Sequence, residues 1–321
     1  MNTMETLPND WDELQKSLGA SILQSSVWAE FQESLGRSTY FEWSNHWSWV
    51  GYEHNLKGIK YLFIPYGPTA SLNSLQAVQS VVQTAKSEGF DFVRIEPMGK
   101  VTPEDLSAIS AEKVAEVEPE HTQVINLTLD IHQLRQGLHS GHRNLINGTE
   151  RRGLKIEISQ NDSDFEEFLS MLHDTARRAK VKFHSDDYFW AIKKLLEPKG
   201  NSKLYVVRSA EGLVAEALFY DYNGVRYYAH AGAFQEINRK LNGSVSLLWQ
   251  SIIDAKNLGM HSFDLWGVAP GEDPKHKWAG ISKFKKGFGG IAVQHLGTYD
   301  IPLNQTKYKL YKTYRKLRGR G

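Results

Sequence analysis

Residues 215–232, AEALFYDYNGVRYYAHAG, predict two β-strands joined by a tight turn. Asn223-Gly224 favours a two-residue hairpin turn, because both of its positions need a positive φ. The flanking segments, 215–222 and 226–232, are rich in aromatic and other apolar residues, as strands are. A third strand is predicted at 203–208.

Elements on both sides of the hairpin follow from apolar periodicity and from capping residues. Ser163 and Glu166 form a capping box, which marks the start of a helix. The expected elements are a strand at 154–158, helices from 163 and from about 186, the three strands above, a helix over 244–258 and a strand at 262–266. This β-α-α-β-β-β-α-β order resembles the GNAT acyltransferase fold, whose mixed sheet opens between its fourth and fifth strands to admit substrates.

An internal repeat indicates that this architecture is duplicated. The pattern Ala-Lys-x-x-Gly at 85–89 recurs 170 residues later, at 255–259. Each copy ends an apolar helix and precedes a strand, at 92–96 or 262–266. We therefore predict an α/β fold of two tandem GNAT-like domains with mixed sheets, residues 1–135 and 136–297, joined near residues 130–141.

The composition is that of a globular protein. At roughly 100–200 residues per domain, 321 residues suit two domains, and 40% of them are hydrophobic. No stretch approaches the roughly 18 apolar residues of a membrane span, and the start resembles no signal peptide. The absence of Cys excludes disulfides, thiolate nucleophiles and Cys-bound metals. We expect a soluble, cytoplasmic protein.

The net charge of +1 averages two unlike regions. Residues 275–321 carry twelve Lys or Arg and one acid, Asp300, giving +11, so the preceding residues carry −10. Such polarity suits contact with a polyanion, although a solvated basic tail is the alternative. Within this region, 307–318 predict a basic helix that either docks on the protein or contacts nucleic acid or a membrane. One face of that helix is expected to hold Leu310, Tyr311, Tyr314 and Leu317.

Several catalytic classes are excluded by missing motifs. The sequence contains no His-Glu-x-x-His, Gly-x-Ser-x-Gly or Walker motif, and His139 and His142 lack an evident third ligand, so we expect no metal site. A GNAT enzyme holds the pyrophosphate of its acyl-CoA on a Gln/Arg-x-x-Gly-x-Gly/Ala loop at a helix N-terminus. Here residues 239–244 place Asn242 where the first Gly should stand, so this loop is interpreted as a helix start and no cofactor is expected.

Residues 275–290, KHKWAGISKFKKGFGG, are the densest chemical signal. Five Lys alternate with aromatic residues, and glycines at 287, 289 and 290 let the backbone approach another surface closely. Cations neutralise phosphates while aromatic faces stack on unpaired bases, at about 1–3 kcal/mol per base. The segment therefore suits the single-stranded end of an RNA, whereas a solvated basic helix explains the lysines alone.

Five motifs in order along the chain are similar to those of the FemABX family. They are ILQSSVW at 22–28, IPYGP at 64–68, a helix over 140–153 ending ERRG, FDLWGV at 263–268 and FKKGFGG at 284–290. The resemblance implies transfer of an amino acid from aminoacyl-tRNA to the stem peptide of a peptidoglycan precursor, which builds the interpeptide bridge. It also implies that residues 298–321 return to complete the first domain. The chain has no room for the inserted helical arm of some members.

The resemblance also implies roles for particular residues. Phe284 and Lys285 match the Phe-Lys pair at the aminoacyl-tRNA end, where an ammonium can stabilise the oxyanion formed during aminolysis. Lys283 and Lys286 would contact tRNA phosphates. Glu96 stands where the family has an acid near the incoming amine, so it is a candidate base, although a carboxylate at a strand end more often pairs with a neighbour.

The precursor is expected to bind at Lys182, His184, Tyr188 and His230. Tyr188 agrees with the family pattern, whereas His184 and His230 replace a guanidinium and a phenol. Arginine binds a diphosphate at any pH, but histidine is only partly charged at neutrality. We therefore expect a lipid-linked rather than a UDP-linked muropeptide precursor, used at the inner face of the membrane with help from the basic C-terminal helix.

Two alternatives remain open. One is an acyl-CoA-dependent N-acyltransferase of the GNAT class, against which the degenerate loop at 239–244 argues. The other is a non-catalytic RNA-binding protein that uses the Lys/Phe segment. We expect an aminoacyltransferase that needs neither a metal nor a covalent intermediate.

Overall fold

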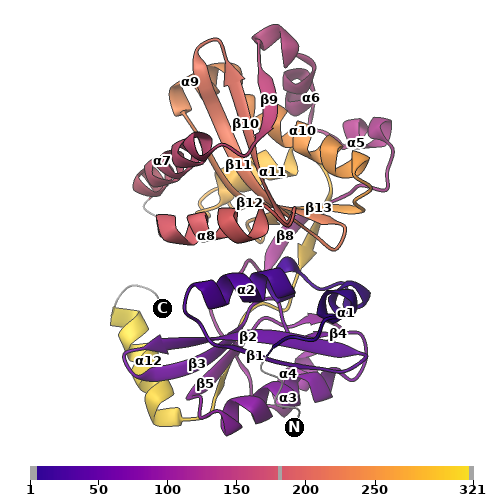
Figure 1. The fold of residues 1–321 in the computed structure, drawn as a ribbon. Coiled ribbons are helices and arrows are strands. Elements are labelled where there is room, and N and C mark those ends of the chain that lie inside the picture. Colours follow the sequence, from indigo (N-terminus) through magenta and orange to yellow (C-terminus); the bar gives the residue numbers. More distant parts are fainter. Residues whose placement is uncertain (1–5, 180–182, 318–321) are drawn as a thin grey trace. The chain divides into compact units, whose positions relative to one another are not determined.

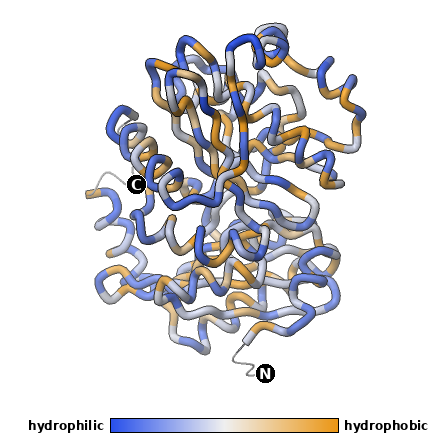
Figure 2. Tube along the Cα trace, turned by 45° about the horizontal axis from the view of Figure 1, so that its top comes forward, coloured by the Kyte–Doolittle hydropathy of each residue, from blue (hydrophilic) through white to orange (hydrophobic). Residues whose placement is uncertain are grey.

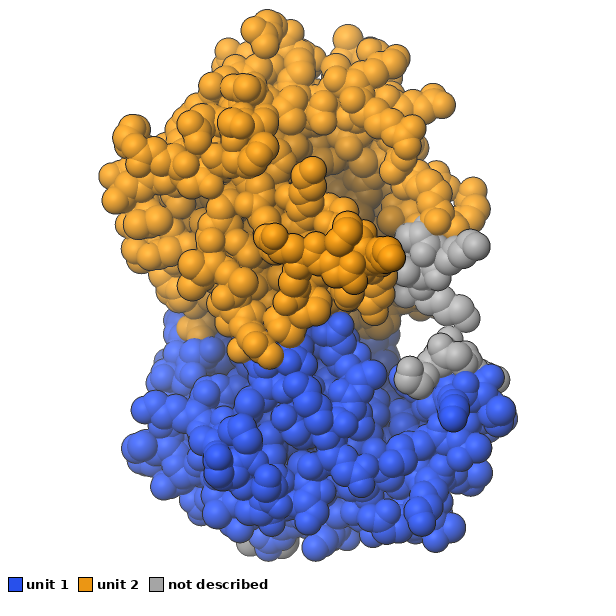
Figure 3. Space-filling model, turned by 180° about the vertical axis from the view of Figure 1, so that it is seen from behind, with its two compact units in different colours: residues 1–120, 295–321 blue, residues 121–294 orange. Residues whose placement is uncertain are grey.

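Residues 6–179 and 183–317 are described by the computed structural model, and they form two compact units (Figures 1 and 3). Unit 1 comprises residues 1–120 and 295–321, and unit 2 comprises residues 121–294. Hydrophobic and hydrophilic residues are interspersed along the described part of the chain (Figure 2).

Unit 1 contains an eight-stranded mixed sheet in the order β6-β4-β2-β3-β5-β15-β7, with β1 also paired to β2. Its long central strands are apolar and buried, whereas the outermost strands are short, which limits exposed sheet edges. The strands are β1 (Thr39–Trp43), β2 (Trp47–Leu56), β3 (Ile59–Ile64), β4 (Thr69–Ala70), β5 (Phe92–Ile95), β6 (Met98–Gly99), β7 (Glu112–Lys113) and β15 (Tyr299–Pro302).

Helices cover both faces of this sheet (Figure 1). The apolar stripe of α3 (Ser74–Ser87) packs Val78 and Val81 onto Leu62 and Ile64 of β3. On the opposite face, Tyr308 and Tyr311 pack with Ile59 and Phe92. The remaining helices are α1 (Trp11–Leu18), α2 (Ser26–Ser34), α4 (Pro103–Ala108) and α12 (Gln305–Leu317), with a short 3-10 helix at Ile22–Gln24.

Unit 2 contains a seven-stranded mixed sheet in the order β14-β8-β13-β12-β11-β10-β9. The predicted hairpin is present, with Tyr222 opposite Val225 and with positive φ at both Asn223 and Gly224. The strands are β8 (His121–Asn126), β9 (Lys155–Ser159), β10 (Ser202–Ser209), β11 (Gly212–Tyr222), β12 (Val225–Ala233), β13 (Ser262–Gly267) and β14 (Ile291–Gln294).

The helices of unit 2 also lie on both faces of its sheet (Figure 1). Leu248 and Ile252 of α10 pack on Phe219 and Phe263, whereas α7 contacts the other face along β12. The helices are α5 (Ile131–Gly137), α6 (Ser140–Asn147), α7 (Asp162–Ala179), α8 (Asp186–Leu196), α9 (Gln235–Leu241), α10 (Gly243–Asn257) and α11 (Ala279–Lys286). The predicted order is confirmed, with α9 as an addition. None of the described helices is both long and apolar enough to cross a membrane.

Two predicted boundaries differ from the structure. The first unit was expected to extend to residue 135, but β8 pairs with β13 and β14, so residues 121–135 belong to unit 2. The helix predicted over 140–153 ends at Asn147 and is followed by a 3-10 helix, Glu150–Arg152. The first difference follows from strand pairing between distant segments, and the second from Gly148, which caps the C-terminus of α6.

The C-terminal segment is attached to unit 1 by a buried ion pair. Arg94 on β5 forms a bidentate pair with Asp300 on β15, with both N···O distances at 2.7 Å. The hydroxyl of Tyr308 donates to Asp300, and Arg94 donates to the hydroxyl of Tyr311. Each buried charge is therefore paired and hydrogen-bonded, as burial of an ion requires.

The docked face of α12 differs from the prediction. Tyr308 and Tyr311 are buried, but Leu310 is 61% exposed and Leu317 is 82% exposed. The expected apolar face of Leu310, Tyr311, Tyr314 and Leu317 is therefore wrong, because the two tyrosines that reach the Arg94–Asp300 pair determine which side docks.

The internal repeat is confirmed in three dimensions. In unit 1, α3 connects β3 to β5, which pair in parallel. In unit 2, α10 lies between β12 and β13, which also pair in parallel. The sequence offset of 170 residues places Arg94 and Asp264 at the same position of the two repeated strands.

Glu216 on β11 is a buried carboxyl group without compensation. Its side chain is 1% exposed, and among the described residues none donates a hydrogen bond to either carboxylate oxygen. Burial, assisted by the negative charges of Asp164 and Glu167, raises the pKa of Glu216 to about 9. The group is therefore protonated at neutral pH.

We expect Glu216→Gln to remove a pH dependence of stability. Because the folded-state pKa lies above the unfolded value, protonated Glu216 stabilises the fold fully below about pH 4.5, and this contribution is lost as pH rises towards 9. In urea unfolding from pH 5 to 9, the wild type should lose stability more steeply than Glu216→Gln. The exposed control Glu211→Gln should follow the wild type, and parallel curves for all three proteins would contradict the assignment.

Candidate active site

The sheet of unit 2 opens between β12 and β13. The two strands pair at three positions only, from Val225 opposite Ser262 to Tyr227 opposite Asp264. Beyond Asp264 both strands continue without pairing to each other, and this is the opening that the GNAT-like order predicted between the fourth and fifth strands. Lys285 of α11 contacts both strands there.

Lys285 is directed into the protein. Its side chain is 7% exposed, and Nζ donates to the carbonyl oxygen of Gly267 at 2.8 Å. The same Nζ lies 5.7 Å from the ring centroid of Tyr228 on β12. Burial lowers the pKa of the Lys285 ammonium to about 8, while the nearby carboxylate of Asp264 opposes this shift. The position is buried and electrostatically perturbed, as catalytic positions often are.

Phe284, the neighbour of Lys285, packs on the other side of α11. Its ring lies edge-on to His142 of α6, at 5.7 Å between centroids, and edge-on to Phe288 at 5.4 Å. Lys283 is exposed and Lys286 is half-buried. Of these four consecutive side chains, Lys285 therefore lies in the opening between β12 and β13, whereas Lys283, Phe284 and Lys286 border a cavity.

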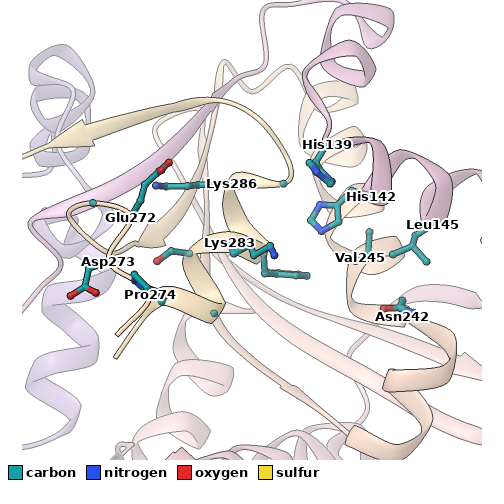
Figure 4. A pocket seen from close by; sticks show the side chains of 16 residues that line it. His139, His142, Leu145, Asn242, Val245, Glu272, Asp273, Pro274, Lys283 and Lys286 are labelled. Carbon is teal, nitrogen blue, oxygen red and sulfur yellow. The ribbon is translucent and has the colours of Figure 1, made fainter. Parts of the chain in front are cut away.

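This cavity, of about 780 Å³, lies within unit 2 (Figure 4). Lys283 and Lys286 come from α11, while His139 and His142 come from the start of α6. Cations and partly apolar walls suit an anionic ligand that also carries a flat ring. Other lining residues are Leu145, Asn242, Val245, Glu272, Asp273, Pro274 and Phe284.

The degenerate loop at 239–244 comprises the end of α9 and the start of α10, with Asn242 between the two helices. Asn242 has φ +49°, and the backbone N–H of Ser244 donates to the side chain of Asn238. A side chain at Gly243 would collide with Val214, which explains the glycine through packing. One of the amide groups that would hold a pyrophosphate is thus already engaged, in agreement with the interpretation made from the sequence.

The glycines after Phe288 serve internal packing. Gly289 and Gly290 both have positive φ, and a Cβ atom would meet the carbonyl of Gly137 or of Val124. Gly287 lies against the ring of His142. The expectation that these glycines approach an external surface is therefore corrected, because the surface they approach belongs to the same unit.

Glu96 lies in unit 1 directly after β5, and both of its carboxylate oxygens accept hydrogen bonds. Its carboxylate accepts hydrogen bonds from the backbone N–H groups of Tyr66 and Glu118 and from the hydroxyl of Thr298. Burial raises the pKa of Glu96, and these hydrogen bonds oppose the shift. The carboxylate joins three segments of unit 1, while its role as a base stays a prediction.

We expect Glu96→Ala to destabilise unit 1. Three buried donors lose their acceptor, at a cost of about 3 kcal/mol in unfolding free energy. Chemical denaturation should show this loss, whereas the exposed control Glu112→Ala should change stability by less than about 0.5 kcal/mol. Unchanged stability combined with lost activity would instead assign Glu96 to the reaction.

The residues predicted for the precursor gather at the start of α8 and on β12, with His184 just before the helix. His184 stacks on Tyr188 at 3.7 Å between centroids, and Phe189 lies edge-on to both His184 and His230. Burial, with a further effect from His184, lowers the pKa of His230 to about 3, so His230 is neutral and carries no charge for a diphosphate. The last predicted member, Lys182, lies outside the described residues.

Three further residues at the opening were missed by the sequence analysis. Asp264 and Tyr228 lie beside Lys285, and Ser282 ties α11 to Ala269, whose N–H donates to its hydroxyl at 2.7 Å. The signal for Asp264 was present, because a charged residue interrupts the otherwise apolar strand 262–266.

The two mixed sheets and the strand opening define a tandem GNAT-like protein, and solved structures agree. FemX superposes with a TM-score of 0.83 at 16% identity, covering 97% of this chain and 99% of that chain. A tandem GNAT protein from the clavulanic acid biosynthesis pathway superposes with a TM-score of 0.52 at 9% identity, covering 93% and 97%. At such identities the likeness establishes the fold, and the predicted fold class is confirmed.

Sequence comparison indicates the family. Residues 206–316 match the model of the FemAB family. The aminoacyltransferase FemA of Staphylococcus epidermidis is 27% identical over 106 residues, which are 33% of this chain and 25% of FemA. The match thus spans a quarter of the length of that relative. Together these findings confirm the resemblance to the FemABX family that the five motifs indicated.

Proposed function

We propose that this protein is an aminoacyltransferase that moves an amino acid from aminoacyl-tRNA to the stem peptide of a peptidoglycan precursor. The observation that carries the proposal is the buried ammonium of Lys285 in the strand opening of a GNAT-like domain. The family match over residues 206–316, which include this lysine, supports the same chemistry.

The reaction needs stabilisation of one developing charge. The acceptor amine attacks the ester carbonyl, a C–N bond forms, and the negative charge gathers on the carbonyl oxygen. When the C–O bond breaks, the ribose oxygen leaves and takes up a proton, while the nitrogen loses one. Lys285 donates one N–H to Gly267, and its ammonium retains two further donors. One positioned donor to an oxyanion contributes about 3–4 kcal/mol.

The cavity beside α11 is the proposed site for the tRNA end. Lys283 and Lys286 supply charge for phosphates, and Phe284 and His142 supply ring faces for bases. An acyl-CoA donor is disfavoured, because Asn238 already occupies the N–H of Ser244 at the start of α10. The acceptor is proposed to bind at His184, Tyr188 and His230, where neutral His230 supplies no charge for a diphosphate.

We expect Lys285→Met to reduce kcat/KM for transfer by about 100-fold or more, because methionine keeps the volume and removes the charge. The assay uses radiolabelled aminoacyl-tRNA with lipid-linked and UDP-linked precursors in parallel. Lys283→Met should instead weaken tRNA binding and flatten its salt dependence. The exposed control Lys194→Met should match the wild type.

The outcomes separate the alternatives. A wild-type protein that binds RNA without transferring an amino acid would indicate an RNA-binding module. Binding of acetyl-CoA in calorimetry, without tRNA-dependent transfer, would indicate a GNAT acyltransferase. Full activity of Lys285→Met would remove the proposed oxyanion role.

We infer that α12 provides a peripheral membrane contact for use of the lipid-linked acceptor. Its docked face is aromatic, so Leu310 and Leu317 lie on the outward side, one heptad apart and flanked by Lys309 and Lys316. Lysines attract anionic head groups at about 1 kcal/mol each, and exposed leucines gain free energy by inserting among them.

We expect the protein to float with vesicles containing 30% phosphatidylglycerol but not with pure phosphatidylcholine vesicles. The double variant Leu310→Ser/Leu317→Ser should lose most of this binding while keeping the charge. Leu75→Ser, at an exposed leucine of α3, should bind as the wild type. If the serine variant still floats, the membrane assignment is wrong. If Lys309→Glu/Lys316→Glu weakens RNA binding and leaves flotation unchanged, the surface contacts RNA instead.

A further inference from the structure

Asp264 lies at the centre of a local distortion of β13. Its Oδ1 accepts a hydrogen bond from the backbone N–H of Trp266 at 2.7 Å, two residues further along the chain. Trp266 has φ +61°, in the left-handed region that a bulky side chain rarely adopts. Aspartate side chains characteristically stabilise such turns by bonding to the backbone two residues on.

The distortion changes how the strand continues. β13 pairs with β8 up to Asp264 opposite Val124, and pairing resumes only at Gly267 opposite Thr122, with a shift of register between them. The first carbonyl after the left-handed residue, that of Gly267, is the acceptor for Nζ of Lys285. The turn that Asp264 holds therefore determines where that acceptor stands.

A second bond connects the same segment to α11. The N–H of Ala269 donates to the hydroxyl of Ser282, three residues before Lys285 on the helix. The strand end after the turn and the helix that carries Lys285 are thus joined at two points, Gly267 and Ala269. A shift of this strand end would move the ammonium with it.

The duplicated fold provides an internal comparison. The residue equivalent to Asp264 in unit 1 is Arg94, which pairs with Asp300 of a neighbouring strand. The residue equivalent to Trp266 is Glu96, which is not among the residues with positive φ. The repeated β-α-β framework thus forms without this turn, and the turn occurs in the unit that contains Lys285.

We propose that Asp264 is a positioning residue, which sets the place of the Lys285 ammonium through the turn at Trp266 and the carbonyl of Gly267, and which preserves its charge. The proposal rests on the proposed function in assigning a reaction to Lys285. The placement itself, and the effect of one charge on the other, are properties of the fold and can be measured without substrate.

Removal of the Asp264 charge is expected to change the pKa of Lys285 in one direction only. The groups that face Lys285 are Tyr228 from β12 and Asp264 from β13, whereas Lys283 and Lys286 of its own helix border the cavity. Burial raises the pKa of Tyr228, so its phenol is neutral, and Asp264 supplies the nearby negative charge. Burial lowers the pKa of Lys285 to about 8, and removal of the Asp264 charge lowers it further. The active ammonium is then lost at a lower pH.

Two variants of Asp264 separate position from charge. Asp264→Asn keeps an oxygen acceptor for the Trp266 N–H and removes the charge. Asp264→Ala removes both the acceptor and the charge. Glu211→Gln removes an exposed charge of the same unit and serves as the control. Circular dichroism and thermal unfolding establish that each variant is folded before it is compared.

The first measurement is the pH profile of kcat/KM. For Asp264→Asn we expect activity near pH 6.5 within about threefold of the wild type, and an alkaline limb displaced to lower pH by at least half a pH unit. For Asp264→Ala we expect at least a tenfold loss at every pH, because Gly267 no longer holds Nζ in place. An unchanged alkaline limb in Asp264→Asn, or equal activity of both variants with the wild type, would overturn the proposal.

The second measurement is independent of catalysis. NMR titration of protein labelled with ¹⁵N-lysine gives the pKa of Lys285, with the resonance assigned by its absence in Lys285→Met. A lower pKa in Asp264→Asn, with no change in Glu211→Gln, supports the charge effect even if the wild type transfers no amino acid. In that outcome the proposed function fails and the charge effect stands, whereas an unchanged pKa contradicts the proposed effect of Asp264 on Lys285.

Discussion

The hydrogen bond between Nζ of Lys285 and the carbonyl of Gly267 is the interaction on which the geometry of the candidate active site depends. An ammonium withdrawn from water costs several kcal/mol unless its donors are satisfied and an opposite charge is near. The structure meets both conditions, with a carbonyl in direct contact and Asp264 nearby. Because Gly267 belongs to the strand that leaves β12, the same bond fixes α11 at the mouth of the sheet. The charge of Lys285, the divergence of β12 from β13 and the position of α11 therefore depend on one another.

The two units share one β-α-β framework but place different residues at the end of its parallel strand pair. In unit 1 the position after the parallel pair is occupied by local structure, since Glu96 accepts three donors and Arg94 binds the returning C-terminal strand. In unit 2 the corresponding space receives Lys285, and a cavity lies on the other side of α11. The same framework therefore carries structural contacts in unit 1 and a buried ammonium in unit 2.

Most of the fold and part of the candidate site could be predicted from local sequence patterns. The Asn223-Gly224 turn, the strand alternation and the helix periodicity of residues 154–266 each act over a few residues, so they could be predicted. The docking face of α12 could not, because it follows from the pairing of Arg94 with Asp300, 206 positions apart. Lys285 was identified by its motif, but its burial and the neutrality of His230 depend on side chains brought together from several elements. The close approach of Gly289 to Gly137 and of Gly290 to Val124 likewise depends on segments that are distant in the sequence.

The location of β15 has a consequence for synthesis of the protein. This strand lies between β5 and β7 in the sheet of unit 1, yet it follows all of unit 2 in the sequence. A ribosome must therefore release the 203 residues between β5 and β15 before the flank of β5 is covered. Until then the nascent first unit presents an open edge and an uncompensated Arg94, both of which favour holding by a chaperone. Unit 2, encoded without interruption, is free to fold while the earlier unit waits.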